Sequence, residues 1–96
     1  TAFVIIPGGL GTLDELTEVL TLMQTHKIKP FPVVLFDSKY WKGFLDWLKE
    51  TVLGCGFISE GDFNILRICD TIEEVLEAVQ SWYIRQEIVG RKALRR

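Results

Sequence analysis

The chain is 96 residues long, carries a net charge of −2, and is 48% hydrophobic. This length allows one domain at most, and the hydrophobic content is sufficient for a core. The sequence shows no signal-peptide pattern and no apolar run near the ~18 residues that cross a membrane, so we expect no membrane association. Cys55 and Cys69 lack C-x-x-C spacing, which predicts reduced thiols in a cytoplasmic protein.

The charge is distributed unevenly along the chain. Six basic residues face twelve acidic ones before Arg85, a net charge of −6, whereas residues 85–96 hold five basic residues and only Glu87 as an acid. A basic end can contact nucleic acid, but here the body is acidic and no aromatic residues alternate with the basic ones. We therefore expect no nucleic-acid partner, and we interpret residues 90–96 as a basic tail at a solvated helix end or partner contact.

Residues 3–12 combine a strand with a glycine-rich turn. Residues 3–6 are four consecutive apolar side chains, typical of a short buried strand, and Pro7 ends it because proline has no N–H. Three glycines follow within the next four positions, and helical periodicity begins at Thr12. Glycines there allow positive φ angles and a close approach to bare N–H groups, which together with the helix dipole favour an anion such as phosphate.

A structural alternative remains open for the same residues. Thr12 and Glu15 fit a capping box, in which the threonine caps the helix and the glutamate bonds back to it. Both acids of the predicted first turn, Asp14 and Glu15, would also suit the dipole. The glycines would then serve only a tight turn. However, Thr71 and Glu74 repeat the pattern at another helix start with no glycine before them, so a cap alone does not require the glycines.

The remaining chain alternates between strands and helices. The expected strands are 33–36 and 64–69, and the expected helices are 12–25, 39–53 and 71–89, the last ending at Gly90. This order predicts an α/β fold with a Rossmann-like parallel sheet flanked by helices. A buried parallel strand so close to residue 1 needs neighbours on both edges, so we expect residues 1–96 to form the C-terminal half of a larger domain.

The turn carries a resemblance to a known family. Residues 7–15, Pro-Gly-Gly-Leu-Gly-Thr-Leu-Asp-Glu, resemble the P-G-G-x-G-T-x-x-E signature of the LOG ("lonely guy") family. Its members are cytokinin-activating nucleoside 5′-monophosphate phosphoribohydrolases, also described as possible lysine decarboxylases. The resemblance extends to about Trp82 in the order of elements. The family's upstream arginine motif, which contributes to the active site, has no counterpart in these 96 residues.

The resemblance implies a substrate, a reaction and a site. The substrate would be a nucleoside 5′-monophosphate such as a cytokinin riboside monophosphate or AMP, hydrolysed at its N-glycosidic bond. Glu15 would be the catalytic carboxylate, with Asp14 as the less favoured alternative. The substrate-binding residues would be Pro7, Gly8, Gly9, Gly11 and Thr12. No cofactor is implied, and no metal either, because cysteine, histidine and carboxylate residues do not cluster at ligand spacing.

Two other function classes stay open. A non-catalytic phosphate- or nucleotide-binding module would use the same turn, although it would gain nothing from Glu15. Amino-acid decarboxylation would need a cofactor lysine, for which the sequence gives no indication.

The resemblance also implies a homodimer or a higher homo-oligomer, formed through helices that follow the signature. The chain carries more large apolar side chains than half a sheet needs, namely Met23, Trp41, Trp47, Trp82 and Tyr83.

Overall fold

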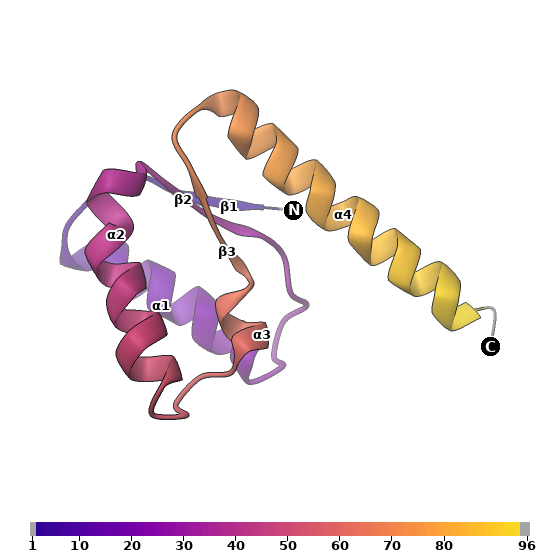
Figure 1. Cartoon of the computed structure of the whole chain (residues 1–96), viewed down its shortest axis with the longest axis horizontal. Coiled ribbons are helices and arrows are strands. Elements are labelled where there is room, and N and C mark those ends of the chain that lie inside the picture. The colour runs from indigo at the N-terminus through magenta and orange to yellow at the C-terminus, as the bar shows by residue number, and fades with distance from the viewer. Residues whose placement is uncertain (1, 95–96) are drawn as a thin grey trace.

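The computed structural model describes residues 2–94, with side chains to residue 89, and has an α/β architecture (Figure 1). Three parallel strands form one sheet in the order β1-β2-β3, and their bounds are Phe3–Ile5, Val33–Phe36 and Leu66–Cys69. The register places Ile5 beside Leu35 and Leu35 beside Ile68. The predicted α/β class and the parallel sheet are therefore confirmed.

The helices divide between the two sides of the sheet. Their bounds are Leu10–Gln24 for α1, Ser38–Trp47 for α2, Leu48–Leu53 for the π-helical continuation η1, Glu60–Phe63 for α3 and Ile72–Leu94 for α4. Figure 1 shows α1, α2 and α3 on one side of the strands and α4 on the other. Right-handed crossovers from β1 to β2 and from β2 to β3 put α1 and α2 on the same face, because the strand order never reverses.

The core lies around the central strand. All three of Val33, Val34 and Leu35 on β2 are fully buried, as expected for a parallel strand with helices over both faces. α1 and α2 each contribute the apolar stripe that their periodicity predicts. The buried members of these stripes are Leu16, Met23, Trp41 and Leu45.

Several predicted boundaries shift. β1 ends at Ile5 and β3 begins at Leu66, so both strands are shorter than expected. The prediction that Gly90 ends the last helix is wrong, because α4 reaches Leu94. One glycine costs a helix only about 1 kcal/mol, which the helix formers after it can offset. Of the predicted basic tail, residues 90–94 have helical backbone, and 95–96 lie outside the described residues.

Some apolar side chains face outward in this structure. On α4 the exposed ones are Ile72, Leu76, Tyr83, Ile84, Ile88 and Val89. Across residues 2–94, no helix has both the length and the apolar character needed to cross a membrane.

Candidate functional site

The glycine turn leads directly into α1. The helix begins at Leu10, two residues before the predicted start, with Gly9 as its N-cap. Its first bond runs from the Leu13 N–H to the Gly9 carbonyl, at 3.2 Å. Helix geometry therefore leaves the N–H groups of Leu10, Gly11 and Thr12 without an acceptor inside the helix, and no side chain caps this end. These three donors and the helix dipole face the turn, an arrangement that suits an anion.

Thr12 is not the cap of α1, so the capping-box alternative is wrong. Thr12 occupies the third position inside the helix rather than its N-cap. At the start of α4 the same sequence pattern does form a cap, because the Glu74 N–H donates to the Thr71 hydroxyl over 3.1 Å. The chain thus uses one pattern in two ways. Glycine is acceptable as an N-cap, so the preceding glycines allow α1 to begin before its threonine.

Gly8 is required by its contact with Thr12. A Cβ placed on Gly8 would lie 2.1 Å from the Thr12 Oγ1 and 2.9 Å from the Thr12 Cβ, closer than any real contact. Among residues 2–94, Gly56 is the glycine with a positive φ, so the expected use of positive φ at Gly8, Gly9 or Gly11 is wrong. The lack of a side chain at Gly8 instead allows Thr12 to pack against the turn.

Gly9 and Gly11 differ from Gly8 because nothing crowds them. A Cβ at either position would meet no atom within 4 Å. Packing within the described residues therefore gives no reason for glycine at these two positions. Bare backbone beside open space is what a ligand needs to approach the first N–H groups of a helix.

Glu15 lies one helical turn after Gly11. Residues four apart share a face of a helix, and side chains lean toward its N-terminus, so Glu15 leans toward the open space at Gly11. Asp14 points to another strip of α1, where it lines a shallow hollow with Thr17 and Glu18. Both acids lie in the second turn of α1, so the prediction that they occupy the first turn is wrong. Glu15 and Asp14 are both exposed.

Tyr40 joins the turn from another element, and the sequence analysis missed it. Its hydroxyl donates to the Gly8 carbonyl, which connects the first turn of α2 to the glycine turn. The carboxyl ends of parallel strands meet at one edge of a sheet, so the first residues after β2 could have been expected near the turn after β1. At the same edge the Ser38 N–H donates to Asp70 over 2.8 Å. This bond holds the pKa of the Asp70 carboxyl below its usual value.

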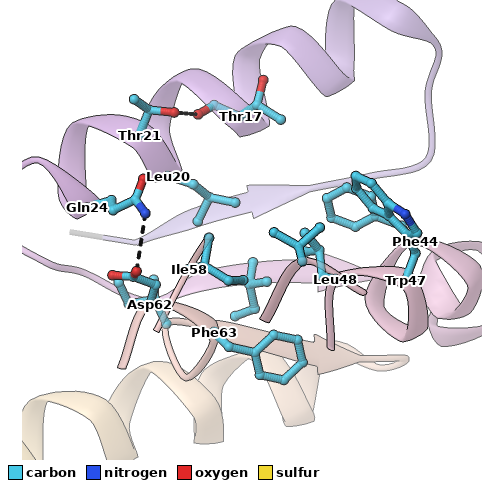
Figure 2. A pocket seen from close by; sticks show the side chains of 13 residues that line it. Thr17, Leu20, Thr21, Gln24, Phe44, Trp47, Leu48, Ile58, Asp62 and Phe63 are labelled. Carbon is cyan, nitrogen blue, oxygen red and sulfur yellow. Dashed lines mark hydrogen bonds between the residues drawn. The ribbon is translucent and has the colours of Figure 1, made fainter. Parts of the chain in front are cut away.

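A separate cavity lies away from the turn (Figure 2). Its volume is about 250 Å³, and it is lined by residues from the second half of α1, the junction of α2 with η1, and α3. Figure 2 shows Leu20, Ile58 and Phe63 around an apolar interior. At its edge the Gln24 Nε2 donates to the Asp62 Oδ2 over 3.4 Å. The cavity contains no residue of the predicted site, and its apolar lining does not suit a phosphate.

The large apolar residues that suggested self-association separate into two groups. Met23 and Trp41 are buried, and Trp82 packs against the core, so these three do not support that argument. Trp47 is 54% exposed and Tyr83 is 40% exposed. Within residues 2–94, no group of three metal-ligating side chains lies together. The two cysteines are not bonded to each other.

Comparison with known proteins identifies the family. The family model described as "possible lysine decarboxylase" matches residues 1–79, which is most of the chain and includes the whole glycine turn. The chain belongs to this family. The resemblance inferred from residues 7–15 is therefore confirmed.

The curated relatives of this chain have a more specific name than the family description. Proteins named cytokinin riboside 5′-monophosphate phosphoribohydrolase include one from Rhodococcoides fascians, 31% identical over 80 residues, which cover 83% of this chain and 40% of the relative. One from Arabidopsis thaliana is 34% identical over 92 residues, which cover 95% of this chain and 42% of the relative. One from Mycobacterium tuberculosis is 34% identical over 80 residues, which cover 80% of this chain and 41% of the relative. The chain spans about two fifths of the length of these relatives.

Proposed function

We propose that the protein hydrolyses the N-glycosidic bond of nucleoside 5′-monophosphates, including cytokinin riboside monophosphates and AMP. The products would be the free base and ribose 5-phosphate. The observation that carries this proposal is the turn before α1, where uncapped N–H groups adjoin open space and Glu15 follows one turn later. The names of the curated relatives support the same reaction.

The phosphate would bind at the glycine turn. Its oxygens would accept from the N–H groups of Leu10, Gly11 and Thr12, with the Thr12 hydroxyl as a further donor. Gly9 and Gly11 would allow the phosphate to come close to the backbone. Pro7 and Gly8 would set the path of the chain into the helix. The chain's own residues bind and orient the substrate in this scheme, and no metal or cofactor takes part.

Glu15 would act on the water and on the sugar. As the bond between the base nitrogen and the sugar C1′ breaks, positive charge develops on the ring, and a carboxylate beside it stabilises that charge. A water oxygen then bonds to C1′ and gives its proton to Glu15, while the departing base takes up a proton from solvent. Glu15 returns its proton to solvent.

The reaction is tested on the full-length protein with AMP and with isopentenyladenosine 5′-monophosphate. We expect equal amounts of free base and ribose 5-phosphate, measured by chromatography and a reducing-sugar assay. A parallel incubation with lysine and pyridoxal phosphate tests the decarboxylation that the family description suggests, and we expect no amine product. Nucleotide binding without release of base would favour the non-catalytic module, and no binding would contradict the proposal.

We also propose that the protein forms a homodimer or a higher homo-oligomer. Exposed Trp47 on α2 and the exposed apolar residues along α4 support this, because exposed apolar side chains can be covered at an interface between copies. Sedimentation velocity of the full-length protein over a hundredfold concentration range is expected to show a species larger than the monomer. A monomer throughout that range would refute the assembly and leave the proposed reaction standing.

We place its activity in the cytoplasm. The two cysteines, one exposed and one buried, suit a reducing compartment. Fractionation of cells that express the tagged full-length protein tests this location, and recovery outside the cytoplasmic fraction would contradict it.

A further inference from the structure

The contact between Tyr40 and Gly8 joins two distant parts of the chain. The two residues are 32 positions apart, and the tyrosine hydroxyl is the donor to the glycine carbonyl. Tyr40 comes from the first turn of α2, whereas Gly8 belongs to the turn before α1. The bond therefore crosses from the end of one strand to the end of its neighbour, at the edge where the proposed substrate binds.

Contacts at the start of α2 fix the position of Tyr40. Asp37 has a φ of 85°, and its carboxylate accepts from the Tyr40 N–H over 3.3 Å. Its own N–H donates to the Cys69 carbonyl at the end of β3 over 2.9 Å. The Tyr40 ring also meets the ring of buried Trp41 edge-on, with centroids 5.0 Å apart. The Tyr40 hydroxyl therefore reaches Gly8 from a helix start that follows β2 directly and is hydrogen-bonded to the end of β3.

Gly8 is held on two sides. Its carbonyl accepts from Tyr40, and the Thr12 side chain occupies the space where a Cβ would be. In a planar trans peptide the carbonyl and the following N–H point in opposite directions. A Gly8 carbonyl fixed toward α2 therefore fixes the Gly9 N–H on the opposite side. Rotation of this peptide would change both the turn and the direction of the donors at the start of α1.

We propose that Tyr40 is a positioning residue for the phosphate of the substrate. Its hydroxyl keeps the Gly8 peptide in the orientation that presents the donors of the turn and of the first turn of α1. The inference rests on the proposed function, and it adds a residue to the site. Preorganised donors bind more tightly because less freedom is lost when the ligand binds.

A stabilising role alone explains the contact less well. Tyr40 is 48% exposed, and a neutral hydrogen bond at the surface contributes little to folding because water offers the same bond. Its removal is expected to change phosphate affinity more than it changes stability. These two quantities can be measured on the same variant.

The test compares Tyr40→Phe with Tyr83→Phe in the full-length protein. Both variants lose one hydroxyl and keep the ring, and Tyr83 lies on α4, away from the turn (Figure 1). The readouts are KM and kcat for AMP, the inhibition constant of ribose 5-phosphate, and the melting temperature. For Tyr40→Phe we expect KM and the inhibition constant to rise together by about three- to tenfold, because ordering a group that was fixed before binding costs affinity of this order. We expect kcat to stay within about twofold, and Tyr83→Phe to leave these kinetic constants unchanged.

The phosphate-free nucleoside provides a second control. The affinity for adenosine is expected to be equal in the wild type and in Tyr40→Phe, because it lacks the group that Tyr40 positions. Unchanged ribose 5-phosphate inhibition in Tyr40→Phe would overturn the role of Tyr40 while the hydrolase activity remained. An equal loss of affinity for adenosine would overturn it in favour of a general structural role. A wild-type protein that binds neither AMP nor ribose 5-phosphate would refute the proposed function and this inference together.

Discussion

Gly11 and Glu15 form a pair at the scale of single residues. The first supplies bare backbone beside open space, and the second supplies an exposed carboxylate one turn later on the same face of α1. A phosphate on the N–H groups at Gly11 would bring the attached sugar into the neighbourhood of Glu15. Binding and catalysis would then depend on different atoms of one helix, and substitutions should separate them.

Glu15→Gln in the full-length protein is expected to lower kcat for AMP by about 10²-fold or more, the range lost with a general acid–base group. KM should change little, because the amide keeps the size of the side chain and the phosphate donors are untouched. The matched control is Asp14→Asn, which removes the neighbouring charge on a different strip of the helix. A near-normal kcat in Glu15→Gln, or an equal loss in Asp14→Asn, would argue against Glu15 as the catalytic carboxylate.

Gly11→Ala is expected to move stability and binding in opposite directions. Alanine favours a helix over glycine by up to about 1 kcal/mol, and the new methyl meets no protein atom, so the melting temperature should hold or rise. The same methyl would crowd a bound phosphate, and crowding of ~1–3 kcal/mol corresponds to a loss of affinity of about fivefold or more. Isothermal titration with AMP measures this loss. Unchanged affinity would mean that phosphate does not approach Gly11.

Gly8→Ala should behave differently from Gly11→Ala. Its Cβ would overlap the Thr12 side chain, so the turn itself must move. We expect a lower melting temperature together with weaker AMP binding, both measured as for Gly11→Ala. A Gly8→Ala variant as stable as the wild type would contradict the close contact between Gly8 and Thr12.

At the scale of elements, α1 and α4 begin in different ways although both carry a threonine three residues before a glutamate. α4 has a side-chain cap from Thr71, whereas α1 begins with a glycine and leaves its first donors open. With Gly9 as its N-cap, α1 gives up only roughly a few tenths of a kcal/mol relative to a side-chain cap. A ligand anion at this end would supply that stabilisation instead.

The two threonines should therefore give opposite results when each is replaced by alanine. Thr71→Ala removes a cap and is expected to lower the free energy of unfolding by about 1 kcal/mol in urea titrations, with AMP affinity unchanged. Thr12→Ala removes no cap, so its main effect should be weaker AMP binding. If Thr12→Ala costs as much stability as Thr71→Ala and binds AMP normally, Thr12 is a structural residue only.

Sequence patterns predicted those elements whose formation depends on neighbours along the chain. The run at residues 33–36 became β2 because a central strand is buried on both faces. The start of α1 could not be predicted in this way. It depends on the packing of Thr12 against Gly8, and Tyr40 reaches Gly8 from 32 residues away. The threonine-to-glutamate pattern is identical at both helices, so only tertiary contacts distinguish them.

At the scale of the whole molecule, the turn stands open to solvent. Ile6 is 66% exposed and Leu10 is 85% exposed, so apolar groups on both sides of the glycines lack cover in this chain. The first arginine of the chain, Arg67, does not serve the turn. Its Nη1 donates to the carbonyls of Asn64 and Leu66, and its guanidinium lies 5.7 Å from the Trp82 ring centroid. These contacts hold it at the amino end of β3, whereas the turn lies at the carboxyl edge of the sheet.

We therefore predict that these 96 residues alone release no measurable adenine from AMP. A phosphate held by N–H groups and one hydroxyl would be bound weakly, since hydrogen bonds with a charged donor are roughly twice as strong as neutral ones. Because the turn is open to solvent, water would reach the sugar and its orientation would not be fixed, and orientation accounts for a large share of the rate that an enzyme gains. Chromatography of AMP incubated with the folded 96-residue chain, checked by circular dichroism, measures the activity directly. A form as long as the curated relatives should be active under the same conditions. Steady release of adenine by the 96 residues would contradict this prediction. It would mean that Glu15 and the glycine turn suffice, or that an arginine from the basic tail of a partner subunit replaces the missing one.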